Sequence, residues 1–218
     1  GITSFLFEFY LTKGDHIMKI TVLSKEAIVV SDETIATAYD AIKAAELMTR
    51  EVLAAKVNGK TVELSTPLTE GDKVQPLTFD DPDGRKVFWH TASHIMAQAV
   101  KRLFPATKLT IGPSIDNGFY YDFDAEKPFG PAELTAIEKE MKSIVHENLH
   151  LERFTLPRDE AIKLMEEKDE PYKVLLIGRV EEGEEISFYR QGDFVDAVPR
   201  LRGSSKSNCT GHHRPDKR

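Results

Sequence analysis

The stretch Val87-Phe-Trp-His-Thr-Ala-Ser-His-Ile-Met-Ala-Gln-Ala-Val100 decides how we interpret the second half of this 218-residue chain. Its apolar residues recur every three or four positions, a spacing that predicts a helix with one buried face. We place the helix at 87–104, because Pro105 lacks the backbone donor that a further turn needs. His90 and His94 are four residues apart, so one helix face carries both imidazoles.

The histidine pair has two interpretations. Two neutral imidazoles on one helix face can share a metal ion, polarise a carbonyl group or position a water molecule. The more ordinary interpretation is that the histidines flank a core face made by Ala92, Ile95 and Met96. The motif alone does not choose between them.

Outward from this helix, the second half of the chain alternates helical and strand patterns, which is typical of the α+β class. Three of the expected helices start with a proline, at Pro131, Pro157 and Pro171. At Pro131 the missing N–H costs nothing, because this position lies early in the helix. The expected elements are strands near 108–111 and 118–124, helices from 130, over 157–168 and over 170–177, and a hairpin over 186–196 with its turn at Gln191-Gly192.

The first half of the chain predicts a smaller sheet that holds one helix. Asn58-Gly59 is a strong two-residue hairpin signal, because both positions tolerate positive φ. Ser31 to Thr34 offers a helix N-cap, and Asp80 to Gly84 is turn chemistry that marks a domain boundary. The expected elements are strands over 18–23, 26–30, 52–57, 61–64 and 73–79 and a helix over 34–46.

The composition of the chain limits the classes of function that it can have. The chain carries 29 Lys and Arg against 36 Asp and Glu, for a net charge of −7, and one Cys. The acidic balance argues against nonspecific nucleic-acid binding by the whole surface, and one cysteine excludes an intramolecular disulfide framework and suits a reducing compartment. No stretch is apolar enough to span a membrane.

The two ends of the chain differ from its body. Residues 1–17 precede a clean strand that opens at Met18, and we interpret them as a translated leader. Residues 197–218 are polar and hold six basic residues against one acidic residue. We expect this tail to be disordered, because it has too little apolar surface to offset its ordering entropy.

Three further features hold candidate chemistry. Lys173 by default extends its charged end to solvent, but a lysine in a cleft fixes a carboxylate or a phosphate. Asp196 ends a hairpin strand, where carboxylates are either turn residues or aimed into sites. The aromatic run Gly118-Phe-Tyr-Tyr-Asp-Phe123 is more typical of packing than of ligand stacking.

The order of these motifs resembles the bacterial threonyl-tRNA synthetase family. Residues 18–80 resemble a TGS domain, a small β-grasp fold, and residues 86–196 resemble the editing domain of threonyl- and alanyl-tRNA synthetases. The blocks that carry the likeness are Phe88 to Val100, Leu109 to Phe123, Glu170-Pro-Tyr-Lys-Val and Tyr189-Arg-Gln-Gly-Asp-Phe-Val-Asp.

The resemblance implies hydrolysis of serine from mischarged threonine tRNA in the cytoplasm. His90 and His94 would line the pocket, Lys173 would hold substrate or water, and Asp196 would orient the seryl group. It implies no certain cofactor here; ATP, Mg²⁺, Zn²⁺ and homodimerisation belong to regions of the full-length family that this chain does not match. The chain thus resembles an N-terminal part that stops before the catalytic core.

The sequence departs from the family after Asp196. The family continues Leu-Cys-Arg-Gly-Pro-His, whose Cys and His complete the pocket, whereas Ala197 follows here. We interpret 197–218 as out of frame, since suitable codons read one base later restore the family sequence. The alternative is an insertion that returns Cys209 and His213 to the pocket, where they would complete a zinc site with the two histidines.

Three functions stay open at this point. The first is an editing hydrolase within a threonyl-tRNA synthetase, active or impaired. The second is a tRNA-binding module without chemistry. The third is a free-standing trans-editing protein.

Overall fold

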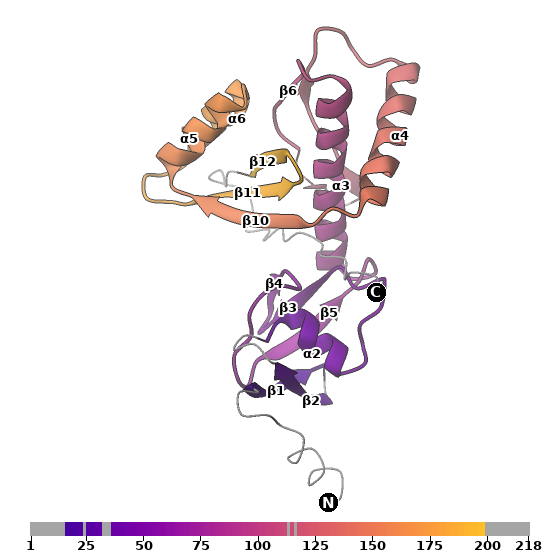
Figure 1. Cartoon of the computed structure of the whole chain (residues 1–218), viewed down its shortest axis with the longest axis vertical. Coiled ribbons are helices and arrows are strands. Elements are labelled where there is room, and N and C mark those ends of the chain that lie inside the picture. The colour runs from indigo at the N-terminus through magenta and orange to yellow at the C-terminus, as the bar shows by residue number, and fades with distance from the viewer. Residues whose placement is uncertain (1–15, 24, 32–35, 113, 116, 199–218) are drawn as a thin grey trace, which may run out of the picture. The chain divides into compact units, whose positions relative to one another are not determined.

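In a computed structural model of the chain, the residues described are 16–23, 25–31, 36–112, 114–115 and 117–198 (Figure 1). They form five helices and several separate sheets, so the predicted mixture of helices and strands is confirmed. The chain divides into two compact units, residues 1–84 and 85–218. No helix among the described residues is long and apolar enough to cross a membrane. The TGS-like and editing-like identities of these units stay predictions.

The first unit is built on a five-stranded sheet with the order β2-β1-β5-β3-β4. β1 runs parallel to β5, and every other neighbouring pair is antiparallel. β1 begins two residues ahead of Met18, inside the segment that we interpreted as a leader. The strands are β1 (His16–Val22), β2 (Lys25–Ser31), β3 (Ala54–Val57), β4 (Lys60–Val62) and β5 (Lys73–Leu77).

The predicted hairpin turn between β3 and β4 is confirmed. Asn58 has φ 49° and Gly59 has φ 84°, the left-handed backbone that this turn requires. The Asn58 side chain also donates to Asp72 Oδ1 at 2.7 Å and accepts from the Lys73 backbone N–H at 3.0 Å. The turn is therefore held by a side chain as well as by its backbone preference.

Helix α2 (Ala38–Ala44) packs on this sheet but is shorter than predicted. Its N-cap is Thr37, which exchanges hydrogen bonds with Asp40 in a capping box. Of the cap expected at Ser31 to Thr34, all but Ser31 lies outside the described residues. Ile42 of the helix and Ile20 of β1 are fully buried in the core between helix and sheet. Burial of each such side chain stabilises the unit by about 1.5–3 kcal/mol.

Helix α3 (Pro82–Leu103) begins five residues earlier than predicted. Pro82 stands in its first turn, where fixed φ favours a helix start, so the Asp80–Gly84 segment is only partly a turn. Asp81 accepts from the Thr78 backbone N–H at 2.8 Å just ahead of the helix. The division between the two units falls after Gly84, within the first turn of α3.

The second unit contains an antiparallel sheet of β10 (Leu151–Leu156), β11 (Ile186–Gln191) and β12 (Phe194–Val198). The predicted hairpin is confirmed, although β11 includes Gln191, so the turn is displaced by one residue. β10 was not predicted. β12 continues through Ala197 and Val198, so assigning these two residues to the polar tail was wrong; Ala197 is buried. Residues 199–218 lie outside the described residues.

The sheet has two different faces. Phe188 and Ala197 point to one face, where α5 (Arg158–Glu167) and α6 (Pro171–Ile177) cover them (Figure 1). Tyr189 and Asp196 alternate with them and therefore point to the other face. The second face carries the candidate site.

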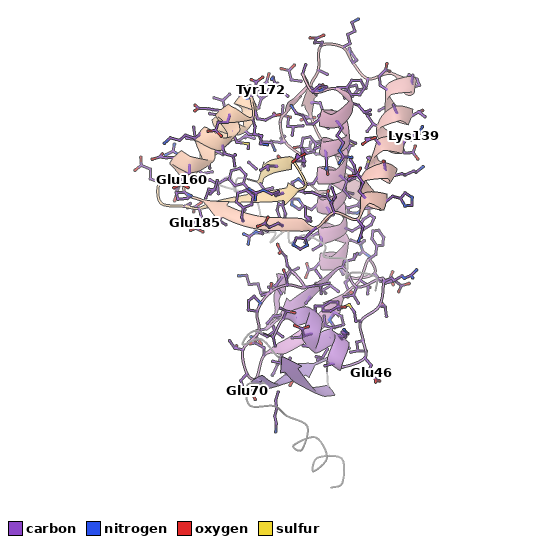
Figure 2. All side chains as sticks on the ribbon, viewed as in Figure 1. Glu46, Glu70, Lys139, Glu160, Tyr172 and Glu185 are labelled. Atoms are coloured by element: carbon purple, nitrogen blue, oxygen red, sulfur yellow. The ribbon has the colours of Figure 1, made fainter. Side chains whose placement is uncertain are left out.

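Helix α4 (Pro131–Glu147) packs along α3 through Ile137 and Ile144. Arg102 of α3 reinforces this contact through ion pairs with two glutamates of α4. Figure 2 shows Lys139 on the outer side of α4 and Glu160 on that of α5. The strand expected at 118–124 is broken, and the short strands here are β6 (Lys108–Leu109), β7 (Ser114–Ile115), β8 (Gly118–Phe119) and β9 (Phe123–Asp124).

We expect Thr37→Ala to lower the free energy of unfolding of the chain by about 1 kcal/mol, because the first turn of α2 loses the side chain that accepts from the Asp40 backbone N–H. Urea unfolding followed by circular dichroism measures this. Thr37→Ser keeps the hydroxyl and should match the unmodified chain; equal stability of Thr37→Ala would contradict the capping assignment.

Candidate active site

The two histidines of α3 meet at their tips. His90 and His94 lie one helical turn apart, and their Nε2 atoms are 3.0 Å from each other. Their rings are nearly perpendicular, with centroids 4.4 Å apart. Both side chains are about 95% buried. The two imidazoles therefore converge on one helix face as predicted, and they contact each other through their Nε2 atoms.

Asp196 of β12 lies next to this pair. Its Oδ2 is 2.8 Å from Nδ1 of His94, an ion-pair contact that lies off the straight hydrogen-bond axis. Tyr121, from the segment between β8 and β9, donates its hydroxyl to the same oxygen at 3.0 Å. The carboxylate is almost completely buried. A buried carboxylate requires such partners, because an unpaired charge in the interior is costly.

Lys173 of α6 completes the cluster. Its ammonium nitrogen lies 2.7 Å from Asp196 Oδ1 and donates to the Tyr121 hydroxyl and to the Ala197 carbonyl, each at 3.1 Å. The ammonium group therefore makes one close ion pair and two hydrogen bonds. Lys173 is buried, so the expectation that its charged end extends to solvent is wrong. The structure thus brings together His90, His94, Lys173 and Asp196 from three separate elements.

Burial and neighbouring charges shift the pKa values of the cluster. Burial by itself would raise the pKa of Asp196, but the Lys173 ammonium and the contact with His94 overcome it and hold that pKa well below the ordinary value. Burial, with a further contribution from His94, lowers the pKa of His90 well below 6.5. Burial and the Asp196 carboxylate raise the pKa of the Tyr121 hydroxyl. His90 is therefore a neutral imidazole at neutral pH.

These contacts order the protons on the two rings. A carboxylate beside Nδ1 of His94 favours a proton on that nitrogen, so a neutral His94 has its lone pair on Nε2. Nε2 of His90 then donates to it across 3.0 Å. His90 consequently carries its own lone pair on Nδ1. The contacts that run from Asp196 through His94 to His90 therefore leave Nδ1 of His90 with a lone pair that can act as a base.

The ring of Tyr189 in β11 packs against the rings of both histidines. Its ring centroid lies 5.4 Å from that of His90 and 5.1 Å from that of His94. Sequence reasoning missed Tyr189, and it assigned Tyr121 to packing. No local signal distinguishes Tyr121 from the aromatic residues beside it; only the approach of β12 brings a carboxylate to its hydroxyl.

A second ion pair, between a partly exposed lysine and a buried glutamate, joins the elements that carry the cluster. Lys101 lies two turns beyond His94 on the same side of α3, and its Nζ is 2.7 Å from Glu170 Oε1. The other oxygen of Glu170 accepts from the Leu109 backbone N–H at 2.8 Å. Glu170 immediately precedes α6, so this pair fixes the end of the helix that presents Lys173.

The described residues contain no group of three or more His, Cys, Asp or Glu side chains that could hold a metal ion. Cys209 and His213, the ligands expected if the tail returns to the pocket, lie outside the described residues. A zinc site made with them stays a prediction.

We expect Asp196→Asn to lower the free energy of unfolding by about 3–5 kcal/mol at pH 7, because it leaves the Lys173 ammonium buried without a counter-charge. Lys173→Met should be similarly costly, and the double variant should cost less than the sum of the two. Urea unfolding of the four proteins measures this coupling; additive losses would contradict a direct interaction.

The same comparison has a pH dependence. Because the pKa of Asp196 is lowered in the folded chain, its contribution is present above its unfolded value of about 4 and is lost as the pH falls below that value. The stability difference between the chain and its Asp196→Asn variant should therefore shrink in acid.

Comparison with known proteins gives the chain relatives but no matching family model. It is 53% identical over 180 residues to a threonine-tRNA ligase of Caldanaerobacter subterraneus subsp. tengcongensis, covering 82% of this chain and 26% of the relative. The ligase of Acetivibrio thermocellus is 58% identical over 161 residues, which are 73% of this chain and 25% of the relative.

The ligase of Clostridium botulinum strain Hall is 48% identical over 198 residues, covering 91% of this chain and 29% of the relative. The chain therefore spans between a quarter and a third of the length of these relatives. By its sequence, this chain belongs to the threonine-tRNA ligase family.

Proposed function

We propose that the second unit hydrolyses the ester of serine attached to threonine tRNA, as an editing step in translation. The buried chain of contacts from Asp196 through His94 to His90 carries the proposal, because it supplies the neutral base that ester hydrolysis needs. The similarity to threonine-tRNA ligases supports threonine tRNA as the partner. Ligation of threonine to that tRNA is the activity that we propose for a full-length protein.

The need for such a step follows from the chemistry of the two amino acids. Serine lacks one methyl group of threonine, and a pocket discriminates one methyl group by only about 1–3 kcal/mol. A ligase for threonine therefore attaches serine at a rate that binding alone does not suppress. A second site that hydrolyses the wrong ester corrects the error after transfer.

In the proposed reaction His90 acts on a water molecule. Nδ1 of His90 takes a proton while the water oxygen bonds to the carbonyl carbon of the ester. The tetrahedral intermediate then collapses, the bond from the carbonyl carbon to the ribose oxygen breaks, and that oxygen takes a proton from His90. The products are free serine and tRNA with an unmodified ribose.

The contacts favour positioning roles for the other members of the cluster. Lys173 was expected to hold substrate or water, yet its ammonium group already forms an ion pair with Asp196 and hydrogen bonds to Tyr121 and Ala197. Asp196 was expected to orient the seryl group, yet both carboxylate oxygens already contact Lys173, His94 or Tyr121. We infer that Lys173 and Tyr121 hold Asp196, and that Asp196 sets the tautomer of His94.

The proposed hydrolysis draws on side chains and water. ATP, Mg²⁺ and Zn²⁺ enter the proposal for a full-length ligase, where ATP activates the amino acid. A cofactor within residues 85–198 is not part of it.

The test is deacylation of threonine tRNA charged with serine or with threonine by the purified chain. We expect faster hydrolysis of the serine ester, because the proposed editing step removes serine and leaves threonine attached. His90→Ala should lower the rate constant about 10²–10⁴-fold through loss of the base. His146→Ala is the matched control, since His146 is an exposed histidine of the neighbouring helix α4.

Three results would contradict the proposal. Equal hydrolysis of both esters would remove the editing role. Hydrolysis that His90→Ala leaves unchanged would remove the base. Binding of tRNA without hydrolysis above the spontaneous rate would establish the binding-module function instead.

A further inference from the structure

One row of side chains crosses the site face of the sheet from solvent to the cluster. Arg153 of β10 stands opposite Tyr189 of β11, and Tyr189 stands opposite Asp196 of β12. Opposite residues of antiparallel strands project from the same face. Tyr189 and Asp196 are buried, whereas Arg153 is exposed. The row spans two strand spacings, about 10 Å.

Arg153 differs from the other arginine of this sheet in its partners. Its Nη2 donates to the Ser187 hydroxyl at 2.8 Å, and no carboxylate of the described residues forms an ion pair with it. Arg190 projects from the opposite face of the sheet, 3.6 Å from Glu152, with its guanidinium carbon 4.7 Å from the centroid of the Phe154 ring. Arg153 therefore keeps guanidinium donors and a positive charge for a ligand.

The surroundings of Arg153 are polar. Thr155, two residues along β10, projects from the same face and is exposed, and Ser187 is half-buried beside it. α5 and α6 cover the other face of the sheet, so they do not shield this one. A guanidinium group beside hydroxyl groups is the chemistry that binds phosphate oxygens and ribose hydroxyls.

We propose that Arg153 binds the 5′-phosphate of the terminal nucleotide whose ribose carries the ester. This inference rests on the proposed function, because the hydrolysis defines which end of the RNA enters the site. The ester lies at His90 in that proposal, and the phosphate is attached to another carbon of the same ribose. One nucleotide therefore presents an ester to the buried end of the row and an anion to its exposed end.

Two small substrates isolate the phosphate. They are adenosine carrying serine on its ribose and the 5′-monophosphate of the same compound. The chain should hydrolyse the phosphorylated compound with the higher kcat/KM, through a lower KM. Arg153→Gln should reduce that preference about 10–100-fold, the effect of losing hydrogen bonds to a charged group, while the unphosphorylated compound reacts as before.

The controls show whether the preference for the phosphorylated compound depends on Arg153 itself or on any positive charge of this sheet. Arg153→Lys should keep part of the preference, because a lysine retains the charge but not the paired donors. Arg190→Gln removes an exposed guanidinium from the opposite face and should change nothing. A preference that survives Arg153→Gln, or that Arg190→Gln reduces equally, overturns the inference.

A binding measurement keeps the inference testable if hydrolysis fails. The probe is a short labelled single-stranded RNA that ends in adenosine, titrated at several salt concentrations. Arg153→Gln should make the slope of log affinity against log salt shallower by about 0.7, the value for one phosphate contact to a single strand. An unchanged slope contradicts the phosphate contact. No hydrolysis with the slope changed overturns only the proposed function.

Discussion

The site of the second unit depends on the ion pair between Lys173 and Asp196. Both groups are buried, and removing two charges from water costs several kcal/mol for each unless their partners compensate. The compensation comes from different parts of the chain: Tyr121 precedes β9, Ala197 belongs to β12, and His94 belongs to α3. The three are brought together only when the helices pack on the sheet, so the pair links folding of the unit to assembly of the site.

The position of the pair also explains the two faces of the sheet. Lys173 comes from α6, which covers the face opposite the histidines, and its ammonium group reaches Asp196 on the site face and the carbonyl of Ala197 in β12. One face of the sheet therefore packs in an apolar core with α5 and α6, and the other face carries the polar groups of the cluster. On that second face the buried cluster lies at β12, and the phosphate contact that we propose lies at β10, where Arg153 is exposed.

Sequence patterns predicted the parts of this arrangement that are local. The spacing of His90 and His94 predicts one helix face, and Asn58-Gly59 predicts its hairpin, because both depend on a few neighbouring residues. Helix starts were less accurate although their signals are local: Pro82 starts α3 inside a segment that was assigned to a turn, and the capping box of Thr37 and Asp40 was overlooked. β10 was missed because Leu151 to Leu156 has an irregular burial pattern on an edge. The role of Tyr121 depends on Asp196, 75 residues away, which no local pattern reports.

The most direct test of this account is the protonation of the two imidazoles, read from their ¹⁵N chemical shifts over a pH series. The account predicts that near pH 7 His94 carries its proton on Nδ1 and His90 carries its own on Nε2, and that His90 gains a second proton only well below pH 6.5. A positively charged His90 at pH 7, or a His94 with its proton on Nε2 alone, would contradict it.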